Sequence, residues 1–316
     1  MTEHAFKPRD RRKADIAGRA YSFIAISLVI CVLAFIIIVT ARYGLSVLSL
    51  DFLLREPNPY MMEEDHGGIL TPIVGTLIVT LSGILIAFPF ALATAIYLCY
   101  YSKKGVFKAI VKTAVDILAG VPTVVIALFA LVFFTMPQMG FFSMLIEGVE
   151  GTSRAFGRSF MVCGMTMAIM ILPFVIKSME EAMKAVPQTY LDASYALGAN
   201  KWRTIRKIAL SVGRSGLITG VILGMGRIIG DTAIVWLTLG GSIRMTGTQP
   251  WHAPENWMST LRSSGSTLTS YIYYASPAGE GNKFDVAFGA SLVLIVIIIL
   301  LNITAAVIGK AGRHNG

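Results

Sequence analysis

The chain alternates between long apolar runs and short polar segments. A helix needs roughly 20 residues to cross a bilayer core of about 30 Å, and six runs reach that length. The first has no charged residue between Tyr21 and Ala41, and it is too long for the apolar core of a cleaved signal sequence. The pattern therefore predicts an all-α membrane protein with six transmembrane helices. The predicted spans are 20–42, 72–100, 108–136, 159–181, 211–239 and 286–309.

The composition supports this interpretation. Hydrophobic residues make up 55% of the 316 positions and charged residues only 14%, whereas soluble domains carry about 25% charged residues. The net charge of +9 does not indicate a nucleic-acid partner, because the basic residues lie in short segments between apolar runs and form no single face. Cys31, Cys99 and Cys163 are widely spaced, and the four histidines lie outside the runs. We expect neither a disulfide nor a metal site.

The basic residues also orient the chain. With the N-terminus in the cytoplasm, 18 of the 27 Lys and Arg residues fall in inside segments and seven fall outside. This bias predicts that both termini are cytoplasmic. The outer loop at about 240–285 is long, polar and aromatic, and we expect it at the outer interface or against a partner protein.

The cytoplasmic segment 182–214 has a distinct local pattern. Pro187 is a favourable first helical residue, Gly198 is a favourable left-handed terminator, and Asn200 can cap a second helix. The segment therefore predicts a helix, a glycine turn and a further helix beneath the membrane. Periodicity alone is equally typical of an ordinary amphipathic helix at the interface.

The motif Asp192-Ala193-Ser194-x-x-x-Gly198 resembles the E-A-A-x-x-x-G loop of binding-protein-dependent ABC importer permeases, the MetI-like permease family. In that family the short helix fits a groove on the ATP-binding subunit. The resemblance implies the same ATPase-coupling role for Pro187, Asp192, Ala193, Ser194 and Gly198. The chain departs from the pattern with Asp for Glu, with Ser for the second Ala, and with Ser211 where the family usually has Pro.

The resemblance covers about residues 68–311 and is greatest to the PstA-type phosphate permeases. It implies a five-helix MetI-like core at 72–311 with a coupling loop at 183–208. The first helix at 20–42, a cytoplasmic tail at 1–19 and an extracytoplasmic loop at 43–71 precede this core. The order and spacing of six segments carry the resemblance: Gly68–Leu77, Ala95–Tyr101, Gly120–Thr123, Glu180–Pro187, Arg227–Ala233 and Tyr271–Pro277.

Arg227 and Asp231 lie inside the fifth apolar run. A charge at the centre of a membrane helix costs about 2.5–3.5 kcal/mol, and residues four apart share a helix face, so the two side chains can pair. In one interpretation Asp231 only neutralises Arg227. In the other, Arg227 faces a central path and binds an oxyanion while Asp231 orients it, because a guanidinium can hold phosphate through two hydrogen bonds. The resembled family has Arg followed by Gly-Glu in this segment, which is thought to line the anion path.

Lys177 closes the fourth run, with Glu180 and Glu181 three and four positions later. Lys177 and Glu180 are further candidates for the substrate path. The alternative is a lysine that pairs with its own helix neighbours while its ammonium reaches toward water. The resembled family commonly has Arg at this position, and lysine lacks the planar fork that binds an oxyanion twice.

Small residues and prolines mark the runs. Gly216, Gly220 and Gly224 recur every fourth residue, a spacing that lets helices approach closely in lipid. We favour packing within the chain over contact with a partner permease. Three prolines interrupt the second, third and fourth runs, either as simple kinks or to expose backbone to a water-filled path. They are Pro89, Pro122 and Pro173.

The chain has no G-x-x-x-x-G-K-[ST] segment, so an ATP site would belong to another polypeptide. We expect no catalytic residue and no cofactor on this chain, with ATP and Mg used by the partner. The resemblance implies a permease subunit of a phosphate importer in the inner membrane. Its partners would be a second, PstC-type permease, two PstB-type ATP-binding subunits and a PstS-type extracytoplasmic phosphate-binding protein. The alternatives are a permease for sulfate, molybdate or phosphonate, and a non-transporting scaffold.

Overall fold

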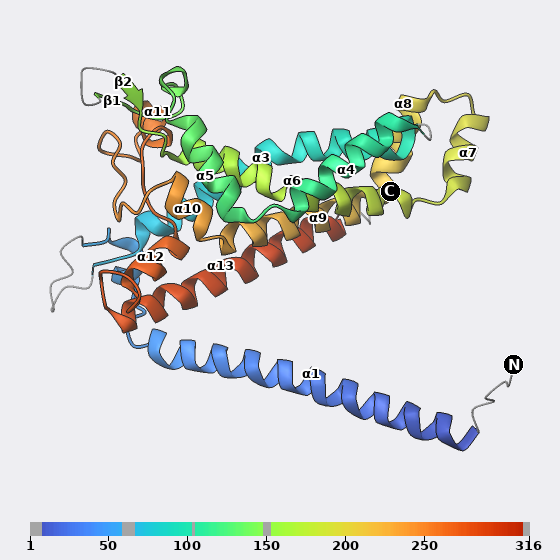
Figure 1. The fold of residues 1–316 in the computed structure, drawn as a ribbon, viewed down its shortest axis with the longest axis horizontal. Helices are drawn as coiled ribbons and strands as arrows, with labels where there is room; N and C mark the ends of the chain where they lie inside the picture. Colours follow the sequence, from blue (N-terminus) through green and yellow to red (C-terminus); the bar gives the residue numbers. More distant parts are fainter. Residues whose placement is uncertain (1–7, 59–66, 103–104, 148–152, 312–316) are drawn as a thin grey trace, which may run out of the picture.

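The computed structural model describes residues 8–58, 67–102, 105–147 and 153–311, and this part of the chain is mainly helical (Figure 1). Parts of the predicted tail at 1–19 and of the predicted loop at 43–71 lie outside these residues. The longer helices are α1 (Pro8–Gly44), α3 (Leu70–Ile96), α4 (Val106–Gly120), α5 (Thr123–Phe134), α6 (Phe160–Lys184), α7 (Gln188–Ala196), α9 (Leu210–Gly230) and α13 (Phe284–Ala311). The short ones are α2 (Leu50–Leu54), α8 (Lys201–Thr204), α10 (Ala233–Thr238), α11 (Trp257–Leu261) and α12 (Leu268–Ala275).

Five helices of the described chain are long and apolar enough to cross a membrane. They correspond to the first, second, fourth, fifth and sixth predicted spans. A π-helical turn, Tyr97–Tyr101, continues α3, and another, Ile205–Ala209, joins α8 to α9. The first helix is longer than predicted, because it begins at Pro8 within the expected tail.

The third predicted span is not one helix. Within 108–136 the chain forms α4 and α5, which meet at an angle of 99°. The residue before a proline is pushed out of the helical conformation, and Val121 has φ −73° and ψ 127° ahead of Pro122. Pro122 is therefore a break, whereas Pro89 and Pro173 lie inside continuous helices. The sixth span exists only if this bent pair counts as one crossing.

The fifth predicted span is also interrupted. Helix α9 ends at Gly230, Asp231 is extended with φ −86° and ψ 119°, and α10 begins at Ala233. The Asp231 carboxylate accepts a hydrogen bond of 2.8 Å from the Ile234 amide. An aspartate that bonds nearby backbone in this way competes with helix continuation, which explains the break.

Helix α6 is the centre of the bundle. In its most apolar window 67% of residues are buried, against 6% in α1. Glycines permit this close packing: a methyl group at Gly220 would lie 3.1 Å from Ser178 Oγ, and one at Gly224 would lie 3.0 Å from Val175. Gly216 likewise abuts Ala182. The expectation that this glycine stripe packs within the chain is confirmed.

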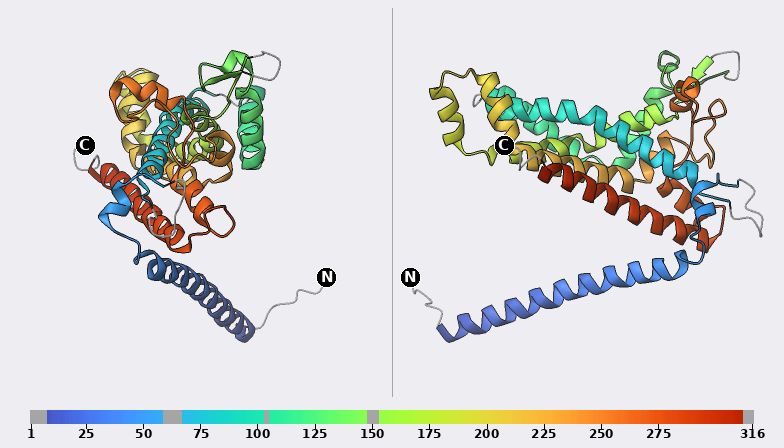
Figure 2. Two further views of the ribbon diagram at one scale, coloured as in Figure 1. Left: turned by 90° about the vertical axis from the view of Figure 1, so that its left-hand side faces the viewer. Right: turned by 180° about the vertical axis from the view of Figure 1, so that it is seen from behind.

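The two ends of the bundle differ, and α1 meets the bundle at only one of them (Figures 1 and 2). One end carries α10, α11, α12 and a hairpin of β1 (Leu145–Glu147) and β2 (Ser153–Ala155), and the other carries α7 and α8. Helix α1 diverges from the bundle and meets α13 near its last turn, where the rings of Tyr43 and Phe288 stack at 5.2 Å. Gly44 packs there against the backbone of Phe288.

We predict that Gly75→Ala destabilises the protein. A methyl group at Gly75 would collide with the Ser266 carbonyl oxygen and lie 3.2 Å from the Phe160 ring. Overpacking of this kind costs about 1–3 kcal/mol, so the melting temperature of the detergent-purified protein should fall.

The matched control is Gly18→Ala, because a methyl group there meets no atom within 4 Å and alanine favours helix. Equal melting temperatures for the two variants would contradict the packing described for Gly75.

Candidate functional site

Arg227, in the last turn of α9, is held by two side chains of α6. Its Nε donates to Met170 Sδ at 3.1 Å, and its guanidinium carbon lies 4.1 Å from the centroid of the Phe174 ring. A cation over an aromatic face is attracted by the ring quadrupole. These contacts occupy one edge and one face of the guanidinium, so the terminal nitrogens remain available to a ligand.

The expected pair of Arg227 and Asp231 is not formed. Among the described residues, no ion pair joins Arg227 to any carboxylate. The prediction assumed one continuous helix through both residues. Because α9 ends at Gly230, Asp231 leaves the face that Arg227 occupies and caps α10 instead.

Lys177 does not pair with its own helix neighbours either. Its Nζ lies 2.6 Å from Asp116 Oδ1 on α4. The buried Glu180 pairs with Lys184 Nζ at 2.7 Å and with Lys112 Nζ at 3.4 Å. The structure therefore brings Lys177 and Glu180 into one cluster with two residues of α4.

Sequence reasoning missed Lys112 and Asp116, as well as Met170 and Phe174 beside Arg227. The sequence contains a pattern that could have indicated Lys112 and Asp116. Lys108, Lys112 and Asp116 recur every fourth residue and so share a helix face. No sequence pattern indicates the contacts of Arg227 with Met170 and Phe174, because these contacts depend on how α9 is rotated against α6.

One stripe of α6 connects Arg227 with the charged cluster. Met170, Phe174 and Lys177 follow each other at helical spacing and share a face, and the rise from the first to the last is about 10 Å. A methyl group at Gly120, which ends α4, or at Gly226, next to Arg227 on α9, would meet no atom within 4 Å. Charged side chains inside a membrane face a bundle interior or a water-filled cavity. This open face is therefore the strongest candidate for a polar path.

The segment beneath the bundle matches its predicted local structure closely. Gly198 has φ +79°, and Asn200 Oδ1 accepts a hydrogen bond of 2.9 Å from the Arg203 amide. Pro187 differs from the prediction by one position, because it precedes the first residue of α7. Helix α7 projects away from the membrane-spanning helices (Figure 2).

Helix α7 borders a groove of about 660 Å³. Ser194 Oγ lies 2.9 Å from Thr204 Oγ1 and ties α7 to α8, while Asp192 is exposed and accepts a hydrogen bond from the Gln188 side chain at 3.0 Å. Leu197 is 89% exposed at the rim. The groove is lined by Tyr190, Ala193, Ser194, Leu197, Gly198, Ala199, Arg203, Lys207, Ile208 and Val212.

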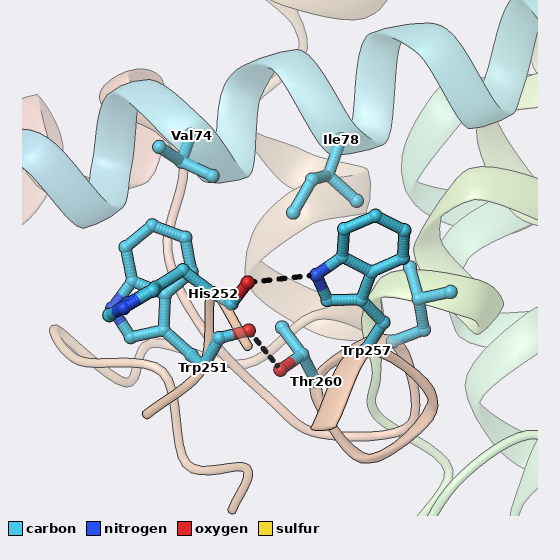
Figure 3. A pocket seen from close by; sticks show the side chains of 7 residues that line it. Val74, Ile78, Trp251, His252, Trp257 and Thr260 are labelled. Carbon is cyan, nitrogen blue, oxygen red and sulfur yellow. Dashed lines mark hydrogen bonds between the residues drawn. The ribbon is translucent and has the colours of Figure 1, made fainter. Parts of the chain in front are cut away.

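At the opposite end, the aromatic loop closes over α3 and forms an apolar pocket of about 430 Å³ (Figure 3). Trp257 Nε1 donates to the His252 carbonyl at 3.0 Å, and Trp251 Nε1 donates to Glu56 Oε1 at 2.9 Å. Both indole N–H groups are therefore used within the chain, and neither is left to donate to a ligand in this pocket. Among the described residues, no three His, Cys, Asp or Glu side chains are grouped as metal ligands.

The sequence model described as "Binding-protein-dependent transport system inner membrane component" matches residues 83–311. "Phosphate transport system permease protein PstA" of Mycobacterium leprae (strain TN) is 30% identical over 269 residues, covering 85% of this chain and 79% of the relative. "Phosphate transport system permease protein PstA 1" of Mycobacterium tuberculosis (strain ATCC 25618 / H37Rv) is 28% identical over 306 residues, covering 96% of this chain and 90% of that relative.

Solved structures share the fold at low identity. The chain resembles one in the crystal structure of a bacterial alginate ABC transporter with a TM-score of 0.61 and 16% identity, covering 95% of this chain and 96% of that one. For a chain of the MetNI methionine ABC transporter the TM-score is 0.57 at 16% identity. The match covers 77% of this chain and 95% of that one. The match over residues 83–311, the relatives and the shared fold agree: this chain belongs to the family of binding-protein-dependent transport system inner membrane components.

Proposed function

We propose that this chain is the permease subunit of an ATP-driven importer for inorganic phosphate. The observation that carries the proposal is Arg227, an exposed guanidinium held against α6 that no described carboxylate neutralises. Met170 and Phe174 fix its plane and leave its terminal nitrogens free. This is the geometry that holds two oxygens of an oxyanion at once. The names of the relatives favour phosphate over sulfate, molybdate or phosphonate.

Both termini would be cytoplasmic, so α7 lies on the side of the ATP-binding subunits. Two such subunits, a second permease of related fold and an extracytoplasmic phosphate-binding protein complete the proposed importer. ATP and Mg would be bound by the ATP-binding subunits, and this chain would contribute no catalytic residue.

The contacts of α7 suggest how force would reach the path. Leu191 on α7 is buried with Val186, which follows α6, and with Ala209, which precedes α9. A pull on α7 would therefore move α6 and α9 together. These two helices carry Phe174 and Arg227, so closure of the ATP-binding pair would change the surroundings of the anion directly.

We predict that Arg227→Ala lowers phosphate uptake by the reconstituted importer roughly 100-fold, because hydrogen bonds to a charged donor contribute up to about 3 kcal/mol. Assembly with the other subunits should persist, since Arg227 is exposed on the open face. The measurement is uptake of labelled phosphate into proteoliposomes alongside co-purification.

Arg42→Ala, at the exposed end of α1, is the control and should transport normally. Normal uptake by the Arg227 variant would remove this residue from the mechanism. If sulfate, molybdate or phosphonate inhibited uptake at concentrations similar to unlabelled phosphate, the competing anion would become the assigned substrate.

We also predict that Ala193→Trp uncouples the complex. The indole would fill the groove beside α7, and overpacking of about 1–3 kcal/mol corresponds to roughly 5- to 150-fold weaker association with the ATP-binding subunit. Pull-down of that subunit and transport-dependent ATP hydrolysis would both decrease.

The matched control is Ala278→Trp, an exposed alanine in the outer loop at the opposite end of the bundle. Undiminished pull-down of the ATP-binding subunit by the Ala193 variant would show that α7 is not the docking helix.

A further inference from the structure

A second group of charges lies along α6 from Arg227 toward α7. Lys112 and Asp116 of α4 face Glu180 and Lys177 of α6 around a cavity of about 190 Å³. Leu98, Val115 and Ile176 complete its lining. Neither the family match nor the relatives' names assign a role to this cavity.

The ion pairs of the cavity differ in how tightly they hold its lysines. Lys177 pairs with Asp116 at 2.6 Å, while Lys184 and Lys112 share Glu180 Oε1 at 2.7 and 3.4 Å. The lining itself holds two lysines and two carboxylates, and Lys184 reaches Glu180 from outside the lining. Lys112 is held least tightly, because Lys184 already occupies the same oxygen at a shorter distance. An anion that enters the cavity would therefore find Lys112 the more easily recruited of the two lining ammonium groups.

The exposed fractions argue against a purely structural pair. The side chains of Lys177 and Asp116 are 48% and 63% exposed, so the rest of the chain does not enclose this pair. Both residues lie well within their helices, where unneeded charges are unfavourable in a membrane. A role in handling a charged ligand explains their presence better than fastening α4 to α6.

We propose that this cavity is a second station for the transported anion and that it selects an oxyanion carrying a proton. The inference rests on the proposed function and specifies the substrate class of the path. Lys177 and Lys112 would donate to unprotonated oxygens of the anion. The Asp116 carboxylate, which can only accept, would receive the hydrogen bond of its O–H group.

This arrangement separates phosphate from sulfate by elementary chemistry. Inorganic phosphate keeps at least one O–H at neutral pH, whereas sulfate has none. A sulfate oxygen placed against Asp116 would meet a like charge with no proton between them, which opposes binding. Asp116 is therefore assigned as a specificity-determining residue, with Lys177 and Lys112 as the anion ligands.

The stripe of α6 makes the two stations consecutive. Phe174, under the Arg227 guanidinium, and Lys177 are three residues apart on one helix face, a rise of about 5 Å. An anion released by Arg227 would next meet Lys177, which exchanges its bond to Asp116 for one to the anion. Asp116 then turns from partner of the lysine to acceptor of the anion's proton, and no bond other than hydrogen bonds is made or broken.

The test uses the assembled importer in lipid nanodiscs without the extracytoplasmic binding protein, so that the selectivity of the path is read directly. The Arg227→Ala background isolates the second station. Labelled phosphate is bound at equilibrium and displaced by unlabelled phosphate or by sulfate. Asp116→Asn should improve the displacing power of sulfate relative to phosphate at least about tenfold, since an amide can donate to an unprotonated oxygen.

Two further variants sharpen the test. Asp116→Glu keeps the acceptor and should retain the preference for phosphate, while Lys177→Gln should weaken both anions similarly. Asp51→Asn, which removes an exposed carboxylate from α2, is the matched control and should change neither. If Asp116→Asn fails to assemble, Asp116→Asn combined with Lys177→Gln removes both charges of the pair, and the assembled double variant should lose phosphate binding.

The inference would be overturned if Asp116→Asn left the displacing power of sulfate relative to phosphate unchanged, or if the double variant still bound phosphate. The ion pair would then only hold α4 against α6. Loss of uptake in Arg227→Ala together with that result would refute only the second station. Normal uptake in Arg227→Ala would instead refute the proposed path at Arg227.

Discussion

Charge inside an apolar medium is the constraint on which the rest of this structure depends. A charged side chain within a membrane span is unfavourable unless it meets a partner, water or a ligand. The chain gathers such groups on the facing surfaces of α4, α6 and α9 rather than spreading them. Arg227 is the extreme case, because an aromatic ring and a thioether hold it while no described carboxylate neutralises it.

Helix α6 connects these charged groups to α7. It is the most buried of the membrane-spanning helices. Glycines of α9 let side chains of α6 pack directly against the backbone of α9. The same helix bears the contacts of Arg227, the charged cluster with α4, and the connection to α7 through Val186. Because these features share one helix, the proposed coupling would make a displacement at α7 and a change around the anion parts of a single movement.

The breaks in the chain also follow from local chemistry. Pro122 turns the third run by 99°, and Asp231 ends α9 and caps α10. Each break leaves a glycine, Gly120 or Gly230, whose Cα faces open space. The open face of the bundle is thus built where helices are interrupted. Interrupted helices are tolerated at membrane depth where they line a cavity or are covered by protein.

The sequence alone determined the membrane character, the family and the local form of the segment 183–208. These depend on composition, run length and turn chemistry, and Gly198 and Asn200 adopt their predicted roles because neighbouring backbone decides them. The tertiary structure decided which charges meet. Lys177 could reach Glu181 on its own helix or Asp116 on another, and only the rotation of α4 against α6 selects Asp116. Likewise, the partners of Arg227 are set by the packing of α9 on α6, which no spacing along the chain encodes.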